Sequence, residues 1–208
     1  FQYRSIQGIN DPDSLPDGII RESDKKLKNT LDLINSLALE IASADIDVDI
    51  YSLMVNKVRE ITKAVAVTIS VYDEESSEMN MRAVSTSSSI LLTAKKVSGV
   101  DIEKLKFKVE PEIKKSMLKD VIAISDDLHE ASLKSFSKPI AKLIQTGLRL
   151  KKFIGISFVH DRKLYGNTFI VLNDSSPPID YELLAVIKAV GSQMMHRRSI
   201  ENHLKEYE

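Results

Sequence analysis

The sequence predicts one α+β domain built around a central β-hairpin, with helices toward both ends of the chain. The hairpin is predicted at residues 152–173, where two apolar runs flank the polar break His160-Asp161-Arg162-Lys163. β-branched and aromatic side chains dominate both runs, which favours strands. Both runs are apolar at most consecutive positions, so we expect both faces of these strands to be covered. A period-two alternation at residues 65–72 predicts a further strand.

The N-terminal part predicts a linker followed by two helices. Residues 1–22 contain Gly8, Pro12, Pro16 and Gly18, which disfavour regular structure, so we expect a linker from an upstream domain. From Ser23, a suitable N-cap, apolar residues recur at heptad spacing: Leu27, Leu31, Ile34, Ala38 and Ile41. A second helix is expected to end near Lys63, with Ile50, Leu53, Met54, Val58 and Ile61 facing inward.

The middle of the chain predicts short elements. Strands are expected at 65–72 and 78–85, joined by a solvated turn, and a polar loop at 85–89. Residues 90–118 predict short helices, one of them with Pro111 in its first turn. A short strand at 121–125 and a helix from Ser137 to about Gly147 should precede the hairpin.

A last helix is predicted from Asp180 toward the C-terminus. Leu183, Leu184, Ile187 and Met194 can face the domain. A rotated seam with four–three steps continues past residue 195, so we expect residues 196–208 to begin a coiled-coil output linker: Val186, Val190, Gln193, Arg197, Ile200, Leu204 and Tyr207. Polar Gln193 and Arg197 in that seam would leave its register adjustable.

Composition excludes several functions. Lys and Arg total 29 against 30 Asp and Glu, so the charge balance gives no basic field for nucleic acid. No apolar run approaches the roughly 18–20 residues of a membrane span. Cysteine is absent, which excludes disulfides and a cysteine nucleophile and fits a cytoplasmic location. The chain starts without methionine and ends within a helical pattern, so we expect a piece of a longer protein.

The order of elements resembles the GAF domain family, the small-molecule sensor modules of sensor kinases, phosphodiesterases and transcriptional activators. The resemblance covers about residues 24–200 and is carried by segments 123–128, 153–159, 164–166, 169–172 and 180–184. It implies a central antiparallel sheet with the N- and C-terminal helices packed on one face. A variable segment covers the other face, where family members place a ligand pocket. Members commonly form dimers through bundles of the terminal helices.

The family's known chemistries transfer poorly to this sequence. Relatives that tether a bilin or reduce free methionine sulfoxide depend on cysteine, which is absent here. The Asn-Lys…Phe…Asp-Glu pattern of cyclic-nucleotide-binding relatives is represented only by Asn56-Lys57, without the remainder. Cyclic nucleotide binding is therefore disfavoured, and the ligand and any cofactor stay unknown.

Histidines and acidic pairs offer candidate sites that each have a simpler interpretation. His129 follows Asp126-Asp127 and could join a carboxylate–imidazole cluster, but a surface position is favoured. His160 is expected to be a solvated turn residue. His196 and His203 lack the acidic residue that follows a phosphoacceptor histidine, so solvated helix positions are favoured. No zinc-ligand spacing or Gly-x-Ser-x-Gly elbow is present.

We therefore expect residues 23–195 to form a non-enzymatic, GAF-like sensor and dimerisation domain of a multidomain signalling protein, such as a sensor histidine kinase. Its expected partners are a second copy bound through the terminal helices, an unknown small molecule, and the upstream and downstream domains of the same chain. The alternative is a purely structural dimerisation module without ligand. An enzyme on the same fold would need a nucleophile or metal cluster. The expected pocket residues are Thr86, Ile124, Leu143 and Phe158.

Overall fold

The computed structural model describes residues 28, 31–32, 35–44, 48–119, 121–132, 134 and 136–205. The predicted linker at 1–22, the seam residues Leu27 and Ile34, and Tyr207 lie outside the described residues. No described helix is long and apolar enough to cross a membrane.

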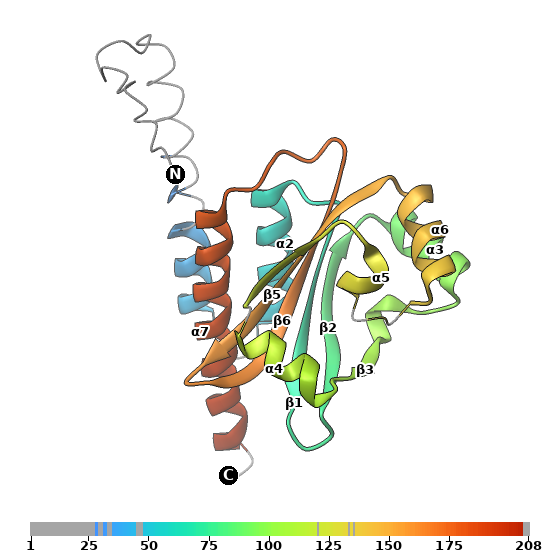
Figure 1. Cartoon of the computed structure of the whole chain (residues 1–208). Coiled ribbons are helices and arrows are strands. Elements are labelled where there is room, and N and C mark those ends of the chain that lie inside the picture. Colours follow the sequence, from blue (N-terminus) through green and yellow to red (C-terminus); the bar gives the residue numbers. More distant parts are fainter. Residues whose placement is uncertain are drawn as a thin grey trace, which may run out of the picture.

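A curled six-stranded antiparallel sheet forms the centre of the molecule, in the order β3-β2-β1-β6-β5-β4 (Figure 1). This arrangement confirms the predicted α+β class and its antiparallel sheet. The strands are β1 (Ala66–Asp73), β2 (Glu78–Thr86), β3 (Lys106–Lys108), β4 (Ile122–Ser125), β5 (Leu150–His160) and β6 (Lys163–Asn173).

The predicted hairpin is the β5–β6 pair at the middle of this sheet. Its two-residue turn is Asp161-Arg162, with φ of 49° and 61°. Positive φ at both central residues matches a type I′ turn, whose twist suits antiparallel strands. The pair runs from Leu150 opposite Asn173 to His160 opposite Lys163, with two irregularities in register.

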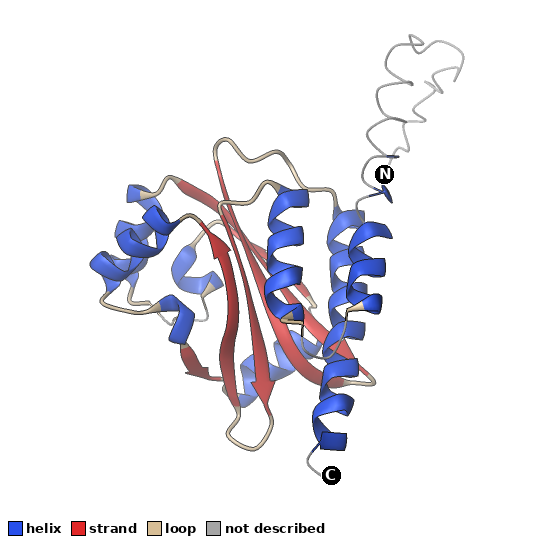
Figure 2. Ribbon diagram, turned by 180° about the vertical axis from the view of Figure 1, so that it is seen from behind, coloured by secondary structure: helices blue, strands red, loops and turns tan. Residues whose placement is uncertain are grey.

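Three helices cover one face of the sheet (Figure 2). They are a helix that includes residues 35–43, α2 (Ile50–Thr62) and α7 (Tyr181–Lys205). Asp49 caps α2 by accepting hydrogen bonds from the backbone N–H groups of Tyr51 and Ser52, both at 3.2 Å. The largest core lies between these helices and the sheet, and its fully buried members include Leu37, Ile50, Met54, Ile69, Ile156, Phe158, Ile170, Leu184 and Met194. The terminal helices therefore share one face, as the resemblance implies.

Shorter elements cover the opposite face (Figure 1). They are α3 (Ser88–Ser98), the 3₁₀ turn η2 (Ile102–Lys104), α4 (Pro111–Lys119), α5 (Leu128–Ala131) and α6 (Lys138–Gly147). Two smaller cores lie beneath them, one around Phe153 and Ile144 and the other around Met79 and Met117. This second face holds the cavities described below.

The predicted polar loop at residues 85–89 is wrong. β2 continues through a buried Ser85 to Thr86, and α3 begins at Ser88 with Ser87 at its N-cap position. The Ser87 side chain makes no capping hydrogen bond, so the packing of Ile90 and Ala94 beside the first of the cavities described below accounts for the helix that follows. Tertiary packing therefore outweighs the weak helix propensity of a serine tract.

Candidate ligand-binding site

A cavity of about 140 Å³ lies between the sheet and the helices α3, α5 and α6. Its walls are mostly apolar, with Val84 and Phe169 from the strands, Ile90 and Ile144 from the helices, and Leu105 after η2. Its polar contributors are Thr68, Ser70, Thr86, Ser132 and Asn167. Among the described residues, none that lines it is charged. The cavity is therefore suited to an uncharged, mainly apolar group.

The alternation of side chains along β6 creates the cavity floor. Asn167, Phe169 and Val171 line the cavity, whereas Thr168 and Ile170 are fully buried on the helix-covered face. The Thr168 hydroxyl donates a 2.7 Å hydrogen bond to the backbone carbonyl of β1 at residue 68. One strand therefore serves both the cavity and the core beneath the terminal helices.

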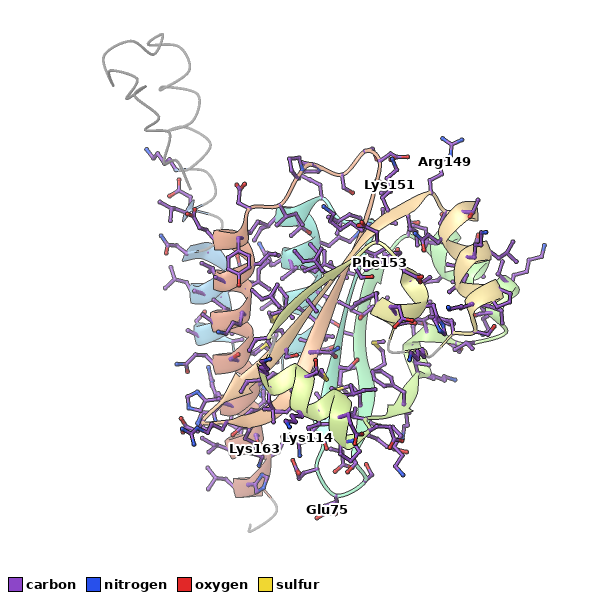
Figure 3. The ribbon with its side chains drawn as sticks, in the orientation of Figure 1. Glu75, Lys114, Arg149, Lys151, Phe153 and Lys163 are labelled. Carbon is purple, nitrogen blue, oxygen red and sulfur yellow. The ribbon has the colours of Figure 1, made fainter. Side chains whose placement is uncertain are left out.

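A second cavity, of about 240 Å³, lies beside the first on the same face, between α4 and the strands β4 and β5. The two share Ala131, Asn167 and Phe169 in their walls. Phe153 lines the second cavity and stacks on Phe169, with ring centroids 5.9 Å apart. Figure 3 places Phe153 near the centre of the sheet, where this wall stands.

The four predicted pocket residues do not come together. Thr86 lines the first cavity, where its hydroxyl donates a 2.9 Å hydrogen bond to the carbonyl of Val65. Ile124 and Leu143 are 54% and 59% exposed and are not among the lining residues of either cavity. Phe158 is fully buried on the opposite face of the sheet, against Gly191 of α7.

Each of those three residues has a chain neighbour that does line a cavity. Ala123 and Ser125 flank Ile124, Ser157 precedes Phe158, and Ile144 follows Leu143. The sequence signal that could have found the strand residues is the small or polar side chain within each apolar run. Such a residue is compatible with a cavity, whereas its bulky neighbour points to the other face of the strand, where Phe158 is buried in the core and Ile124 is exposed.

Two histidines that no sequence motif links, His160 and His196, lie in contact in the structure. His160, at the end of β5, stacks on His196 of α7 with ring centroids 4.1 Å apart. His196 Nδ1 lies 3.1 Å from the Tyr165 hydroxyl oxygen. His160 is therefore not the solvated turn residue that the sequence predicted. His129 packs through Nδ1, 2.6 Å from the Phe136 carbonyl.

Apart from Glu130 in the second cavity, no charged side chain among the described residues lines either of these two cavities. Lys114 of α4 pairs with Glu74, and this hydrogen bond raises the pKa of Lys114. In Figure 3, Lys114 and Glu75 lie toward the bottom of the view, and Arg149 and Lys151 lie toward its top. The described part of the chain contains no group of three or more His, Asp or Glu side chains able to hold a metal ion.

Two arginines of α7 hold the chain between the first helix and α2, and Arg197 holds the end of the first helix itself. The Arg197 guanidinium donates to the carbonyls of Ala42, at 2.9 Å, and Ala44, at 3.4 Å, where the helix of residues 35–43 ends. Arg198 donates to the carbonyl of Val48 at 2.9 Å. Both arginines also contact the carboxylate of Glu201. A cation at the C-terminal carbonyls of a helix is favourable to its dipole.

Comparisons with solved structures, and not with sequences, identify similar proteins. No protein-family model matches the sequence, and no curated protein matches it. Among solved structures, the chromophore-binding domain of a bacteriophytochrome from R. palustris is similar, with a TM-score of 0.63 at 12% identity. The match covers 86% of this chain, which spans 63% of that one.

Two further structures extend the match. The GAF domain of a phosphoenolpyruvate-protein phosphotransferase from Coxiella burnetii has a TM-score of 0.60 at 15% identity, covering 86% of this chain and 98% of that one. A GAF domain/HD domain protein from Geobacter sulfurreducens has a TM-score of 0.51 at 16% identity, covering 70% and 87%. The predicted resemblance is confirmed at the level of structure: this chain has the GAF-domain fold.

Proposed function

We propose that this domain is a non-enzymatic sensor of a small molecule within a signalling protein, and that it relays ligand binding through its terminal helices to an output domain such as a kinase. The fold supports a regulatory role by analogy, because similar structures include a chromophore-binding domain and phosphotransferase GAF domains. The geometry of this chain supports the relay more directly.

The observation that carries the proposal is that one layer of strands separates the cavities from the terminal helices. On β5, Gly155 and Ser157 line the second cavity, while Phe158 beside them packs in the helix-covered core. Ile156 does both, because it borders the cavity and belongs to that core. Interiors are close-packed, so a shift of β5 or β6 toward a ligand must alter the contacts of α7. α7 in turn holds the first helix through Arg197.

We also propose that a second copy pairs with this domain along the terminal helices. Leu39 is 68% exposed on the first helix, and Ile200 and Leu204 are exposed on the last turns of α7. A groove between the two helices is lined by Ala38, Ala42, Val190 and Gln193, among others. Apolar side chains exposed along two adjacent helices favour association with an equivalent surface.

A thermal-shift screen of small molecules, followed by hydrogen exchange, tests the sensor. A ligand should raise the melting temperature and change exchange at residues 35–43 and 195–204 as well as near the cavity. Ala94→Trp, which fills the first cavity from α3, should abolish both effects for a ligand that occupies it. A purely structural module would show neither stabilisation by any compound nor a change at the terminal helices.

Analytical ultracentrifugation tests the pairing separately. Leu39→Glu should shift the population toward monomer, because it places a charge in the proposed interface. Leu92→Glu on α3 is the matched control, since Leu92 is also 68% exposed but lies on the cavity side of the sheet. Equal masses for both variants and the wild type would contradict this interface.

A further inference from the structure

The two cavities differ in polarity although they share a wall. Side chains with oxygen or nitrogen atoms form a smaller share of the lining of the first cavity than of the second, where they are Ser116, Ser125, Glu130, Ser157 and Asn167. Phe169 and Asn167 lie two residues apart on β6, a spacing of about 7 Å along a strand. Because these two side chains line both cavities, the cavities adjoin along this stretch of β6.

Two side chains that line the second cavity, Ser157 and Asn167, have polar atoms free to bind a ligand. Neither the Ser157 hydroxyl nor the Asn167 carboxamide has a hydrogen bond within the described chain, although Ser157 is only 5% exposed. No buried side-chain oxygen or nitrogen among the described residues lacks a partner. The free polar atoms of Ser157 and Asn167 must therefore reach accessible space, and both residues line this cavity. A ligand that fills it has to replace water at these atoms with its own hydrogen bonds.

We propose that the two cavities form one divided site for an amphipathic small molecule, with an apolar ring or short chain in the first and a hydrogen-bonding end in the second. This inference rests on the proposed function, because it names the ligand class of the same sensor. The first cavity sets the size of the apolar part. At about 140 Å³ it is close to the engineered cavity of about 150 Å³ that binds benzene in another protein.

The charge of Glu130 limits which polar groups the ligand can carry. Glu130 is the one charged residue among the described lining of either cavity, and it lies at the exposed edge of the second. A carboxylate there would meet a like charge, whereas an ammonium or a hydroxyl can donate a hydrogen bond to Glu130. The site therefore selects amines and alcohols over acids.

A matched ligand series tests the divided site by isothermal titration calorimetry. Ethylbenzene, 2-phenylethanol, 2-phenylethylamine and phenylacetate share a ring and differ in the group they carry. We expect the alcohol and the amine to bind roughly tenfold tighter than ethylbenzene, the equivalent of about one hydrogen bond. Phenylacetate should bind weakest. Glu130→Gln removes the negative charge and should therefore weaken binding of the amine more than binding of the alcohol.

Two substitutions, each of which fills one of the cavities, test the contribution of each cavity to binding. Gly155→Val should remove the advantage of the alcohol and amine while leaving ethylbenzene binding unchanged, because a Cβ at Gly155 meets nothing within 4 Å and projects into open space. Ala66→Leu fills the first cavity and should abolish binding of the whole series. Urea unfolding of each variant verifies that it remains folded.

The outcomes distinguish this inference from the proposed function. Equal affinity of ethylbenzene, alcohol and amine, or no effect of Gly155→Val, would overturn the divided site and leave the sensor standing. If none of the four binds but another class of compound stabilises the protein in the thermal-shift screen, the amphipathic class is wrong and the sensor again stands. If no compound of any class stabilises the protein, both proposals fail.

Discussion

Gly191 of α7 packs directly against Phe158 of β5, and replacing it with alanine should destabilise the domain. A Cβ at this position would lie 2.1 Å from Cε1 and 2.5 Å from Cζ of Phe158. Carbon atoms pack at about 3.5 Å or more, so the ring or the helix must move by about 1.4 Å. Phe158 is fully buried, which leaves its ring no solvent-filled space to enter.

The expected cost follows from two opposing effects. Overpacking a close-packed core costs about 1–3 kcal/mol, and the rigid ring beneath Gly191 places this site at the upper end. Alanine is favoured over glycine within a helix by about 1 kcal/mol, which offsets part of the cost. We therefore expect Gly191→Ala to lower the free energy of unfolding by about 2 kcal/mol.

Urea unfolding monitored by circular dichroism measures this change. Gly147→Ala at the end of α6 is the matched control, because a Cβ there meets nothing within 4 Å, and its effect should stay within about 0.5 kcal/mol. Phe158→Leu in the Gly191→Ala background should recover part of the loss, giving a coupling above about 0.5 kcal/mol. A Gly191→Ala protein as stable as the wild type, or strictly additive effects, would refute the close contact between α7 and β5.

Three further changes probe other contacts. Asp49→Ala removes the cap of α2 and should lower the free energy of unfolding by about 1 kcal/mol in urea titrations, with Asp49→Asn retaining most of it. Arg197→Met keeps the length of the side chain but not its hydrogen bonds to the first helix, so amide exchange at residues 35–43 should quicken while that of β5 is unchanged. Burial acts to raise the pKa of Glu201, but hydrogen bonds and charge from Arg197 and Arg198 outweigh it and hold the pKa below the ordinary 4.5. Its contribution to stability is therefore present above pH 4.5 and is lost as the pH falls through the lower folded-state value, so Glu201→Gln should flatten the acid limb of stability against pH. An acid limb identical to that of the wild type would contradict this role.

The fold could be predicted because its signals are periodic and local. Alternation at residues 65–72 and the apolar runs of 152–173 mark strands whatever their partners, and the polar break at Asp161-Arg162 marks the turn. The same signals do not show which residues of a strand covered on both faces point toward the cavities and which point toward the terminal helices. Phe158 is predicted to line the pocket, yet the cavity lining falls on its neighbour Ser157. Apolar runs covered on both faces carry no period-two contrast, so a shift of one residue is invisible in the sequence.

The histidine contact and the second cavity could not be predicted, because both depend on segments that are distant in the sequence. His160 and His196 stack although 36 positions separate them, and neither neighbourhood carries a motif that would pair them. The second cavity depends on how α4 lies over β5, which no local pattern specifies. Gly155 is a further sequence signal for it, since a glycine in a strand interior often marks a close approach or a space above the sheet.

Arg197 limits how the proposed relay could work. The sequence places it in a helical seam, where a polar residue would leave the register free to slide. In the structure its guanidinium instead holds carbonyls at the end of the first helix. Sliding one helix past the other by a full turn, about 5.4 Å, would break these bonds and expose the carbonyls. A tilt or shift of about 1–2 Å can preserve them. We therefore expect ligand binding to move α7 and the first helix together as one pair, so that the signal is a change in the position of the pair and not a change in register within it.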